Sequence, residues 1–202
     1  RAKPGKVFVV ENGVDMKLYR PFNKADCRKR LGLPQKAKII AYMGSSNDRG
    51  IDWLIEVFPE LAKSSKELRL LLVGKFDHVK QDGVITLKPM PYDELRYAIC
   101  ATDALVIPYQ STPFTEVAYA PYKLVEFMAC NRPIVCTDVG EMKKLLTTTP
   151  ELVCKPMDKE GLKKAVINAL RYKSVNYRKT LTEKGLTWRS SEKSLTGYCS
   201  IY

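Results

Sequence analysis

Histidine is nearly absent from this chain. His78, in a probable loop, is the single histidine in 202 residues, so neither a Ser-His-Asp triad nor a cluster of histidine metal ligands is expected. The cysteines form no CxxC pair, which argues against a zinc site, and their apolar surroundings predict reduced, buried thiols in a cytosolic protein. They are Cys27, Cys100, Cys130, Cys136, Cys154 and Cys199.

Long apolar runs and the common nucleotide-binding signatures are also missing. No apolar run approaches the length of about 18 residues that a transmembrane helix needs, and no signal peptide is recognised at the start. The GxxxxGK(S/T) pattern of a P-loop is absent, and so is the GxGxxG pattern of a dehydrogenase. These absences exclude a P-loop NTPase and disfavour a dehydrogenase.

Positive charge is in excess. The formal net charge is +12, which favours an anionic partner such as a phosphorylated ligand, an anionic lipid or a nucleic acid. Much of the excess lies in residues 155–193, where no RNP motif, zinc finger or helix-turn-helix is recognised. A nucleic-acid partner is therefore not expected, and the simpler interpretation of these lysines and arginines is a solvated helix face.

Short apolar runs alternate with amphipathic stretches along the chain. Strands are expected at 7–10, 39–43, 68–73, 84–87, 104–107, 134–136 and 152–154, and helices at 25–31, 51–62, 91–100, 121–128, 161–171 and 175–184. This alternation predicts parallel βαβ units. The expected fold class is α/β, a doubly wound, mostly parallel sheet with helices on both faces.

The most informative stretch is 119–140. Pro121 suits the first position of a helix, and Ala120 before it offers no side-chain acceptor. The N–H groups of Tyr122, Lys123 and Leu124 therefore lack a local partner. A helix start of this kind, with a lysine beside it, is suited to binding phosphate.

Glu126 follows one turn later in the same helix. Its carboxylate could accept hydrogen bonds from a diol such as ribose. The alternative is an uncapped, solvated helix in which Lys123 and Glu126 form a surface pair contributing about 0.3 kcal/mol. The stretch alone leaves both interpretations open.

A second loop of similar character is expected at the same edge of the sheet. Ligands of doubly wound sheets bind beyond the carboxyl ends of the strands. The loops expected there are 44–50, 108–122, 137–141 and the loop after 84–87. Gly44 and Ser45 allow the backbone to approach a ligand closely, and Arg49 at a helix start suits a bound anion. Alternatively, Asn47 or Asp48 caps the helix and Arg49 is solvated. Two phosphate-compatible loops at one edge favour the anion site.

Five segments, in this order, resemble the carboxyl-terminal, donor-binding half of a family 4 retaining glycosyltransferase of the GT-B fold. They are VFVVENGVD, AYMGSSNDRGIDWLI, LRLLLVG, MPYDELRYAICATDALVIPY and PYKLVEFMACNRPIVCTDVG. The resemblance covers nearly the whole chain and implies the Rossmann-like half of that fold. It also implies a UDP- or GDP-sugar as substrate, a mannosyl- or glucosyltransferase activity, and no cofactor or metal.

The resemblance assigns roles to individual residues. Arg49 and Lys123 match the basic residues that hold the donor diphosphate and stabilise the departing nucleotide, so they are the expected catalytic residues. Gly44 and Ser45 match the glycine loop at the phosphates. Glu126 matches the glutamate that binds the ribose.

Other residues are expected to line the donor through the same resemblance. The backbone of Leu87 and Lys88 would lie near the base. The residues expected along the sugar and the phosphates are Tyr119, Ala120, Tyr122 and Leu124. The chain departs from the family pattern at Ala118, where many members carry a glutamate that contacts the donor sugar.

A larger parent protein is also implied. Residues 1–15 are expected to lead in from an amino-terminal domain that holds the acceptor site, 16–185 to form the donor-binding domain, and 186–202 to cross back as a tail. The isolated domain would bind donor without turnover. The expected location is cytoplasmic, with a basic surface suited to an anionic membrane or a lipid-linked acceptor.

Two other functions are compatible with the residues. A nucleotide-sugar 2-epimerase shares the GT-B fold but needs a histidine and paired acids in its cleft, for which His78 alone is thin support. A basic module that binds nucleic acid would show steeply salt-dependent binding, but its basic residues lack interleaved aromatics and a reading motif.

Overall fold

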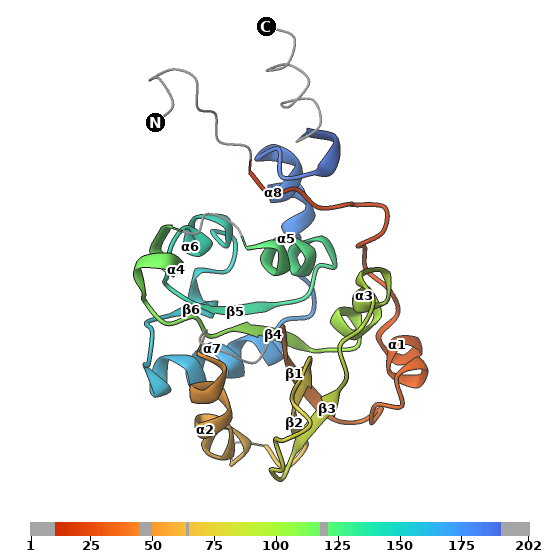
Figure 1. The fold of residues 1–202 in the computed structure, drawn as a ribbon, viewed down its shortest axis with the longest axis vertical. Coiled ribbons are helices and arrows are strands. Elements are labelled where there is room, and N and C mark those ends of the chain that lie inside the picture. The colour runs from red at the N-terminus through yellow and green to blue at the C-terminus, as the bar shows by residue number, and fades with distance from the viewer. Residues whose placement is uncertain (1–10, 45–49, 64, 118–120, 191–202) are drawn as a thin grey trace, which may run out of the picture.

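A six-stranded parallel sheet forms the centre of the fold. The structure, a computed structural model, describes residues 11–44, 50–63, 65–117 and 121–190. The strands follow the order β3-β2-β1-β4-β5-β6, and helices lie on both faces (Figure 1). The expected α/β fold class is confirmed. The strand order reverses between β1 and β4, which is where doubly wound sheets form their ligand crevice.

The bounds of the elements are as follows. The strands are β1 (Lys38–Met43), β2 (Leu68–Val73), β3 (Val84–Leu87), β4 (Ala104–Ile107), β5 (Ile134–Thr137) and β6 (Val153–Cys154). The helices are α1 (Lys24–Arg30), α2 (Ile51–Ala62), α3 (Tyr92–Cys100), α4 (Pro113–Val117), α5 (Tyr122–Ala129), α6 (Met142–Leu145), α7 (Lys159–Arg171) and α8 (Tyr177–Glu183), with a 3-10 helix η1 (Pro150–Leu152).

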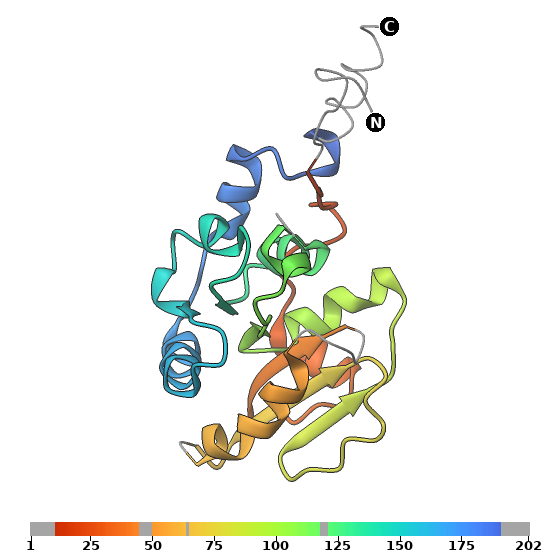
Figure 2. The same cartoon turned by 60° about the vertical axis from the view of Figure 1, so that its left-hand side comes forward.

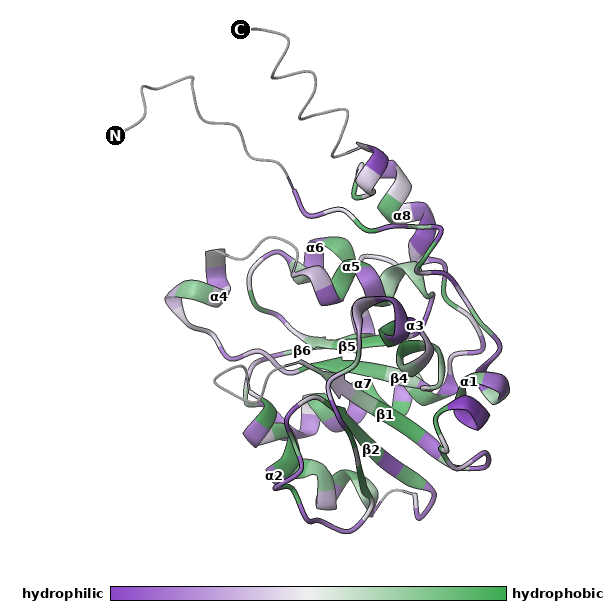
Figure 3. Cartoon of the chain, turned by 45° about the vertical axis from the view of Figure 1, so that its right-hand side comes forward, coloured by the Kyte–Doolittle hydropathy of each residue, from purple (hydrophilic) through white to green (hydrophobic). Residues whose placement is uncertain are grey.

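The central strands are apolar on both sides because helices cover both faces. Alternate residues of a strand point to opposite faces. Ile40 and Leu72 pack in one cluster with α2 and α7, whereas Ala41 and Leu71 pack in another with α1, α3, α5 and α8. Figure 3 shows the strands as a hydrophobic layer between helices whose outer faces are polar. Each fully buried aliphatic side chain contributes about 1.5–3 kcal/mol.

Most expected elements are confirmed, with corrections at their ends. The helix expected from residue 161 begins at Lys159, because the Asp158 carboxylate accepts a hydrogen bond from the N–H of Gly161 and caps the first turn. The last strand is shorter than expected because Leu152 belongs to η1. The short helices α4 and α6 were not predicted, and the strand expected at 7–10 lies outside the described residues.

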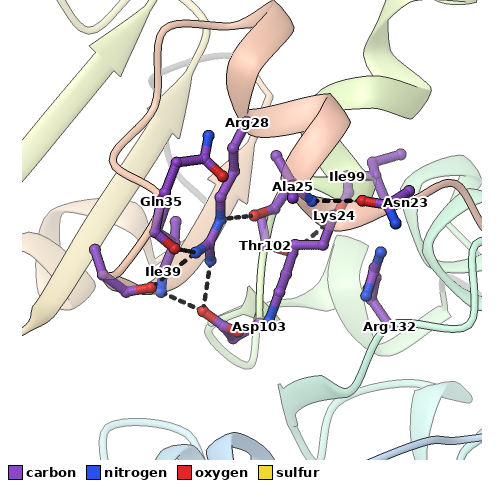
Figure 4. A network of polar contacts seen from close by, with 12 residues as sticks. Asn23, Lys24, Ala25, Arg28, Gln35, Ile39, Ile99, Thr102, Asp103 and Arg132 are labelled. Carbon is purple, nitrogen blue, oxygen red and sulfur yellow. Dashed lines mark hydrogen bonds and ion pairs between the residues drawn. The ribbon is translucent and has the colours of Figure 1, made fainter.

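A buried ionic network attaches α1 to the start of β4 (Figure 4). Arg28 is 2% exposed, donates to the carbonyl of Ala101 at 2.8 Å, and pairs with Asp103 at 2.8 Å. Asp103 also accepts from Lys24 at 2.5 Å and from the N–H of Ile39 at 2.7 Å. Burial acts to raise the pKa of Asp103, but these hydrogen bonds and the two cationic charges outweigh it and hold that pKa below its ordinary value.

The two ends of the described chain meet beside α8 (Figures 1 and 2). The N–H of Val14 donates to the carbonyl of Leu186 at 3.2 Å, and the N–H of Trp188 donates to the carbonyl of Val14 at 3.1 Å, which makes a parallel bridge. The expected division into a lead-in segment, a domain and a tail that begins at 186 stays a prediction.

Arg178 on α8 joins three separate parts of the chain. Its guanidinium donates hydrogen bonds to the carbonyls of Met16, Tyr19 and Ala129, at 2.8 to 3.0 Å. Met16 and Tyr19 precede α1, and Ala129 is the last residue of α5. Arg178 therefore fixes the carboxyl end of α5, the helix that the sequence marks as informative.

The described cysteines are free and buried, as expected. They are Cys27, Cys100, Cys130, Cys136 and Cys154, and Cys199 lies outside the described residues. No group of three or more His, Cys, Asp or Glu side chains is placed to hold a metal ion in the described ranges. Among those same residues, no helix is both long and apolar enough to cross a membrane.

Candidate functional site

A pocket of about 500 Å³ opens at the carboxyl edge of the sheet. The ends of β1 and β2, the loop after β3 and the first turns of α5 surround it. It is lined by Met43, Gly44, Val73, Gly74, Lys75, Pro89, Met90, Leu95, Tyr122, Lys123, Glu126 and Phe127. Its wall is mostly apolar, with three charged side chains, and it adjoins the point where the strand order reverses.

Two glycines bring the strand ends together at this pocket. Gly44 has a φ of 152° and Gly74 a φ of 149°, which L side chains rarely adopt. A Cβ on Gly74 would lie 2.1 Å from the carbonyl oxygen of Gly44, and a Cβ on Gly44 would lie 2.7 Å from the ammonium nitrogen of Lys123. The backbone of both loops thus packs closely, and Gly44 leaves room for the Lys123 side chain.

Lys123 holds its charge at the end of β1. Its nitrogen lies 4.4 Å from the ring centroid of Tyr42, donates to the Tyr42 hydroxyl at 3.4 Å, and lies 5.6 Å from the ring centroid of Tyr109. Both rings are buried. Cation–π contacts of this kind contribute about 0.5–2 kcal/mol, so the ammonium is held in position beside Gly44 and faces the pocket.

Glu126 is buried, which contradicts the interpretation of a solvated surface pair. It is 6% exposed, and no ion pair joins it to Lys123 within the described chain. Burial raises the pKa of its carboxyl from 4.5 to about 7, and the charge of Lys123 offsets only part of the rise. Burial and the Glu126 charge also raise the pKa of Tyr92 to about 12, which places the two groups near each other.

The start of α5 differs from the expectation in two details. The helix begins at Tyr122, and Pro121, in an extended conformation, is the cap residue without a side-chain hydrogen bond. The N–H of Leu124 donates to the Pro121 carbonyl at 2.8 Å, so the prediction that this N–H lacks a local partner is wrong. The side chain of Leu124 is fully buried in the core. Tyr122, 63% exposed, stands at the pocket rim.

The structure brings together some of the expected site residues. Gly44, Tyr122, Lys123 and Glu126 line one pocket. Leu87 and Lys88 precede the lining residue Pro89 without lining the pocket themselves. Four further expected residues lie outside the described ranges. They are Ser45, Arg49, Tyr119 and Ala120.

Sequence reasoning missed the loop after β2. Lys75 follows Gly74 and lines the pocket, yet this loop was not counted among those at the carboxyl edge. The signal was present, because every strand of a parallel sheet ends at that edge and β2 was predicted with its observed bounds. The N–H of Gly140, in the loop 137–141, donates to the carboxylate of Glu116, in the loop 108–122, at 3.3 Å, and neither of these two residues lines the pocket.

Comparison with known proteins identifies the family. Residues 37–172, more than half of the chain, match the family described as "Glycosyl transferases group 1". The chain belongs to the glycosyl transferase group 1 family. The matched range contains β1 to β6 and every described residue that lines the pocket.

Curated relatives of this group 1 chain are longer proteins. A D-inositol 3-phosphate glycosyltransferase of Segniliparus rotundus is 30% identical over 155 residues, which cover 69% of this chain and 33% of that protein. The putative teichuronic acid biosynthesis glycosyltransferase TuaC of Bacillus subtilis is 29% identical over 144 residues, covering 71% of this chain and 36% of TuaC. The group 1 chain thus spans about a third of the length of these relatives.

Solved structures share the fold of the group 1 chain. Sucrose-phosphate synthase of Thermosynechococcus elongatus matches with a TM-score of 0.76 at 22% identity, over 96% of this chain and 52% of that one. Anabaena Alr3699/HepE, in complex with UDP-glucose, matches with a TM-score of 0.68 at 16% identity, over 96% of this chain and 57% of that one. The fold is the Rossmann-like unit of GT-B proteins.

Proposed function

We propose that this chain is the donor-binding domain of a family 4 retaining glycosyltransferase, which transfers a sugar from a nucleotide-diphosphate sugar to an acceptor. One observation carries the proposal: Lys123 and the buried Glu126 line one pocket beside the point where the strand order reverses. A cation suits a diphosphate, and a carboxylate one helical turn away suits the diol of a ribose.

Lys123 would bind the diphosphate, with Arg49 as the second cation and with Gly44 and Ser45 close to the phosphate oxygens. In the reaction, the bond between C1 of the sugar and the phosphate oxygen breaks, and the electron pair stays on that oxygen. Fixed cations stabilise the negative charge that develops there. The acceptor oxygen bonds to C1 and passes its proton to the departing phosphate oxygen, so the transfer balances without a metal ion or a cofactor.

The ionised carboxylate of Glu126 would hold the ribose, because an ionised carboxylate only accepts hydrogen bonds and both ribose hydroxyls can donate to it. The raised pKa of about 7 means that the carboxyl is largely ionised only above neutral pH. The backbone of Leu87 and Lys88 would lie near the base, and Tyr119, Ala120 and Tyr122 would line the sugar. Leu124 would support the site only through its packing in the core, because its side chain is fully buried and its N–H already donates to the Pro121 carbonyl.

The donor would be a UDP- or GDP-sugar. Alr3699/HepE, whose structure holds UDP-glucose, supports a nucleotide sugar in this fold. The family match favours a transferase over a nucleotide-sugar 2-epimerase and over a nucleic-acid-binding module. Transfer of mannose or glucose is the activity that the sequence resemblance to family 4 glycosyltransferases implies.

The acceptor would bind to a separate amino-terminal domain of the parent protein. The relatives are about three times as long as the matched region, which leaves room for such a domain. This chain alone would then bind donor without turnover. A cytoplasmic, membrane-peripheral location completes the proposal, because exposed lysines such as Lys155, Lys159 and Lys164 suit an anionic lipid surface.

Calorimetric titration with UDP and with GDP, at about pH 8, tests the proposal. We expect one of them to bind, and the Lys123→Ala and Glu126→Ala variants each to bind at least about tenfold more weakly. A hydrogen bond to a charged group contributes about 1.5–3 kcal/mol, and 1.4 kcal/mol corresponds to a factor of ten.

Lys164→Ala is the matched control, since Lys164 is exposed on α7, which packs on the face of the sheet opposite α5. This variant should bind as tightly as the original chain. If a folded sample bound neither nucleotide, or if binding survived both site substitutions, the proposal would be wrong.

A further inference from the structure

The pocket has a third charged side chain to which neither the sequence nor the family match gives a role. Lys75 lines the pocket together with Lys123 and Glu126. It is exposed, and none of the described residues forms a hydrogen bond or an ion pair with it. Lys123, in contrast, lies against Tyr42. The Lys75 ammonium is therefore available to a ligand.

Lys75 lies at a defined end of the pocket. It follows Gly74, whose N–H donates to the carbonyl of Leu87 at 2.9 Å, so the ends of β2 and β3 are joined at this point. The side chains around it in the pocket wall are apolar. They are Val73, Pro89, Met90 and Leu95. An amphipathic planar group that entered this end would find apolar walls and one cation.

A nucleotide bound as proposed would place its base at this end. The inference rests on the proposed function, which puts the diphosphate at Gly44 and Lys123 and the ribose at Glu126. Neighbouring strands lie about 4.8 Å apart, and the strand order is β3-β2-β1. The end of β3 therefore lies roughly 10 Å from the end of β1, the scale of the distance from a diphosphate to the far edge of its base, and Lys75, which follows β2, lies one strand spacing from the end of β3.

We propose that Lys75 selects a base that presents a carbonyl oxygen to it, and so discriminates uracil from cytosine and guanine from adenine. An ammonium group has three donors and no acceptor. It can donate to a keto oxygen, whereas the amino group of cytosine or adenine at the same ring position offers only donors. The apolar side chains around Lys75 strengthen this discrimination, because a poorly paired amino group there loses its water.

Two pairs of nucleotides isolate the effect. UDP and CDP differ in the keto or amino group at position 4 and in the proton on the adjoining ring nitrogen. GDP and ADP differ in the same way at position 6 and its adjoining ring nitrogen, and guanine carries an additional 2-amino group. Affinities of all four are measured calorimetrically at about pH 8 for the chain and for Lys75→Met, which keeps the length of the side chain and removes the charge. Lys164→Met is the matched control for removing an exposed lysine.

In the tighter-binding pair, we expect the keto nucleotide to bind about tenfold more tightly than the amino nucleotide to the original chain and to Lys164→Met. In Lys75→Met the ratio should fall to about threefold or less, with the loss confined to the keto nucleotide. Circular dichroism and urea denaturation of Lys75→Met should match those of the original chain, because the substituted side chain is exposed.

Three results would overturn the inference, and they are distinguishable. If Lys123→Ala and Glu126→Ala lose binding but the keto-to-amino ratio is the same in Lys75→Met, the assignment of Lys75 is wrong and the proposed function stands. Equal weakening of all four nucleotides in Lys75→Met would place Lys75 at the phosphates instead. If none of the four binds to the folded chain, the proposed function and this inference both fail.

Discussion

Replacing Glu126 by glutamine should change how the stability of the chain depends on pH. The pKa of this carboxyl rises from 4.5 in the unfolded chain to about 7 in the fold, because burial disfavours the charged form. As pH increases, the unfolded chain releases the proton first. The stability associated with this group is therefore complete below pH 4.5 and is lost as pH rises through about 7.

The size of the effect follows from these two values. For one group of this kind, linkage gives a loss of about 2 kcal/mol in the free energy of unfolding between about pH 5.5 and about pH 8. Glu126→Gln does not titrate and should lack this loss. In a chain of this size the difference corresponds to about 4–8 °C in Tm.

Urea denaturation of both proteins at the two pH values measures the effect. The difference between the two pH dependences cancels the contributions of the titrating groups that both proteins share. Glu160→Gln, an exposed glutamate in the first turn of α7, is the matched control and should follow the original chain. Parallel profiles for Glu126→Gln and the original chain would refute the argument that Glu126 is a buried carboxyl.

Two further substitutions test the framework and the pocket wall. Asp103→Asn should lower the free energy of unfolding by about 3–5 kcal/mol, because it leaves the buried guanidinium of Arg28 without its carboxylate. Urea denaturation measures this loss. A loss no larger than that caused by Asp93→Asn, at an exposed position, would contradict the prediction. Gly44→Ala should weaken binding of the preferred nucleotide at least about tenfold, because the new Cβ lies 2.7 Å from the Lys123 nitrogen. Gly32→Ala, also at a positive φ but with nothing within 4 Å, should lose about 1 kcal/mol of stability and keep its affinity in the same titrations.

The fold was predictable from local patterns where those patterns were complete. The helix Ile51–Ala62 has both of its predicted bounds, because its apolar periodicity and the glycine before it are visible in the sequence. The strands Leu68–Val73 and Val84–Leu87 were predicted for the same reason. The helices α4 and α6 were not, since elements of five and four residues carry too few apolar positions to show a period.

The burial of Glu126 was not predictable from the sequence. The helical pattern places it opposite Leu124, Phe127 and Met128, on the face expected to meet water. Its charge raises the pKa of Tyr19 and of Tyr92, which are distant in sequence and lie near it in the fold. Long-range packing of this kind leaves no local periodicity to detect. The roles of Ser45, Arg49, Tyr119 and Ala120 stay predictions.

The meeting of the two chain ends has a mechanical consequence. The segments at Val14 and Thr187 run in the same direction. A force that pulls these segments apart along the chain therefore slides one past the other and loads the hydrogen bonds of Val14 and Trp188 together, in shear. Arg178 ties Met16 and Tyr19 to α8 just behind this bridge. Tension between the two ends therefore acts first on the Val14–Thr187 bridge and the Arg178 hydrogen bonds, and it reaches the sheet and its pocket only after these hydrogen bonds break.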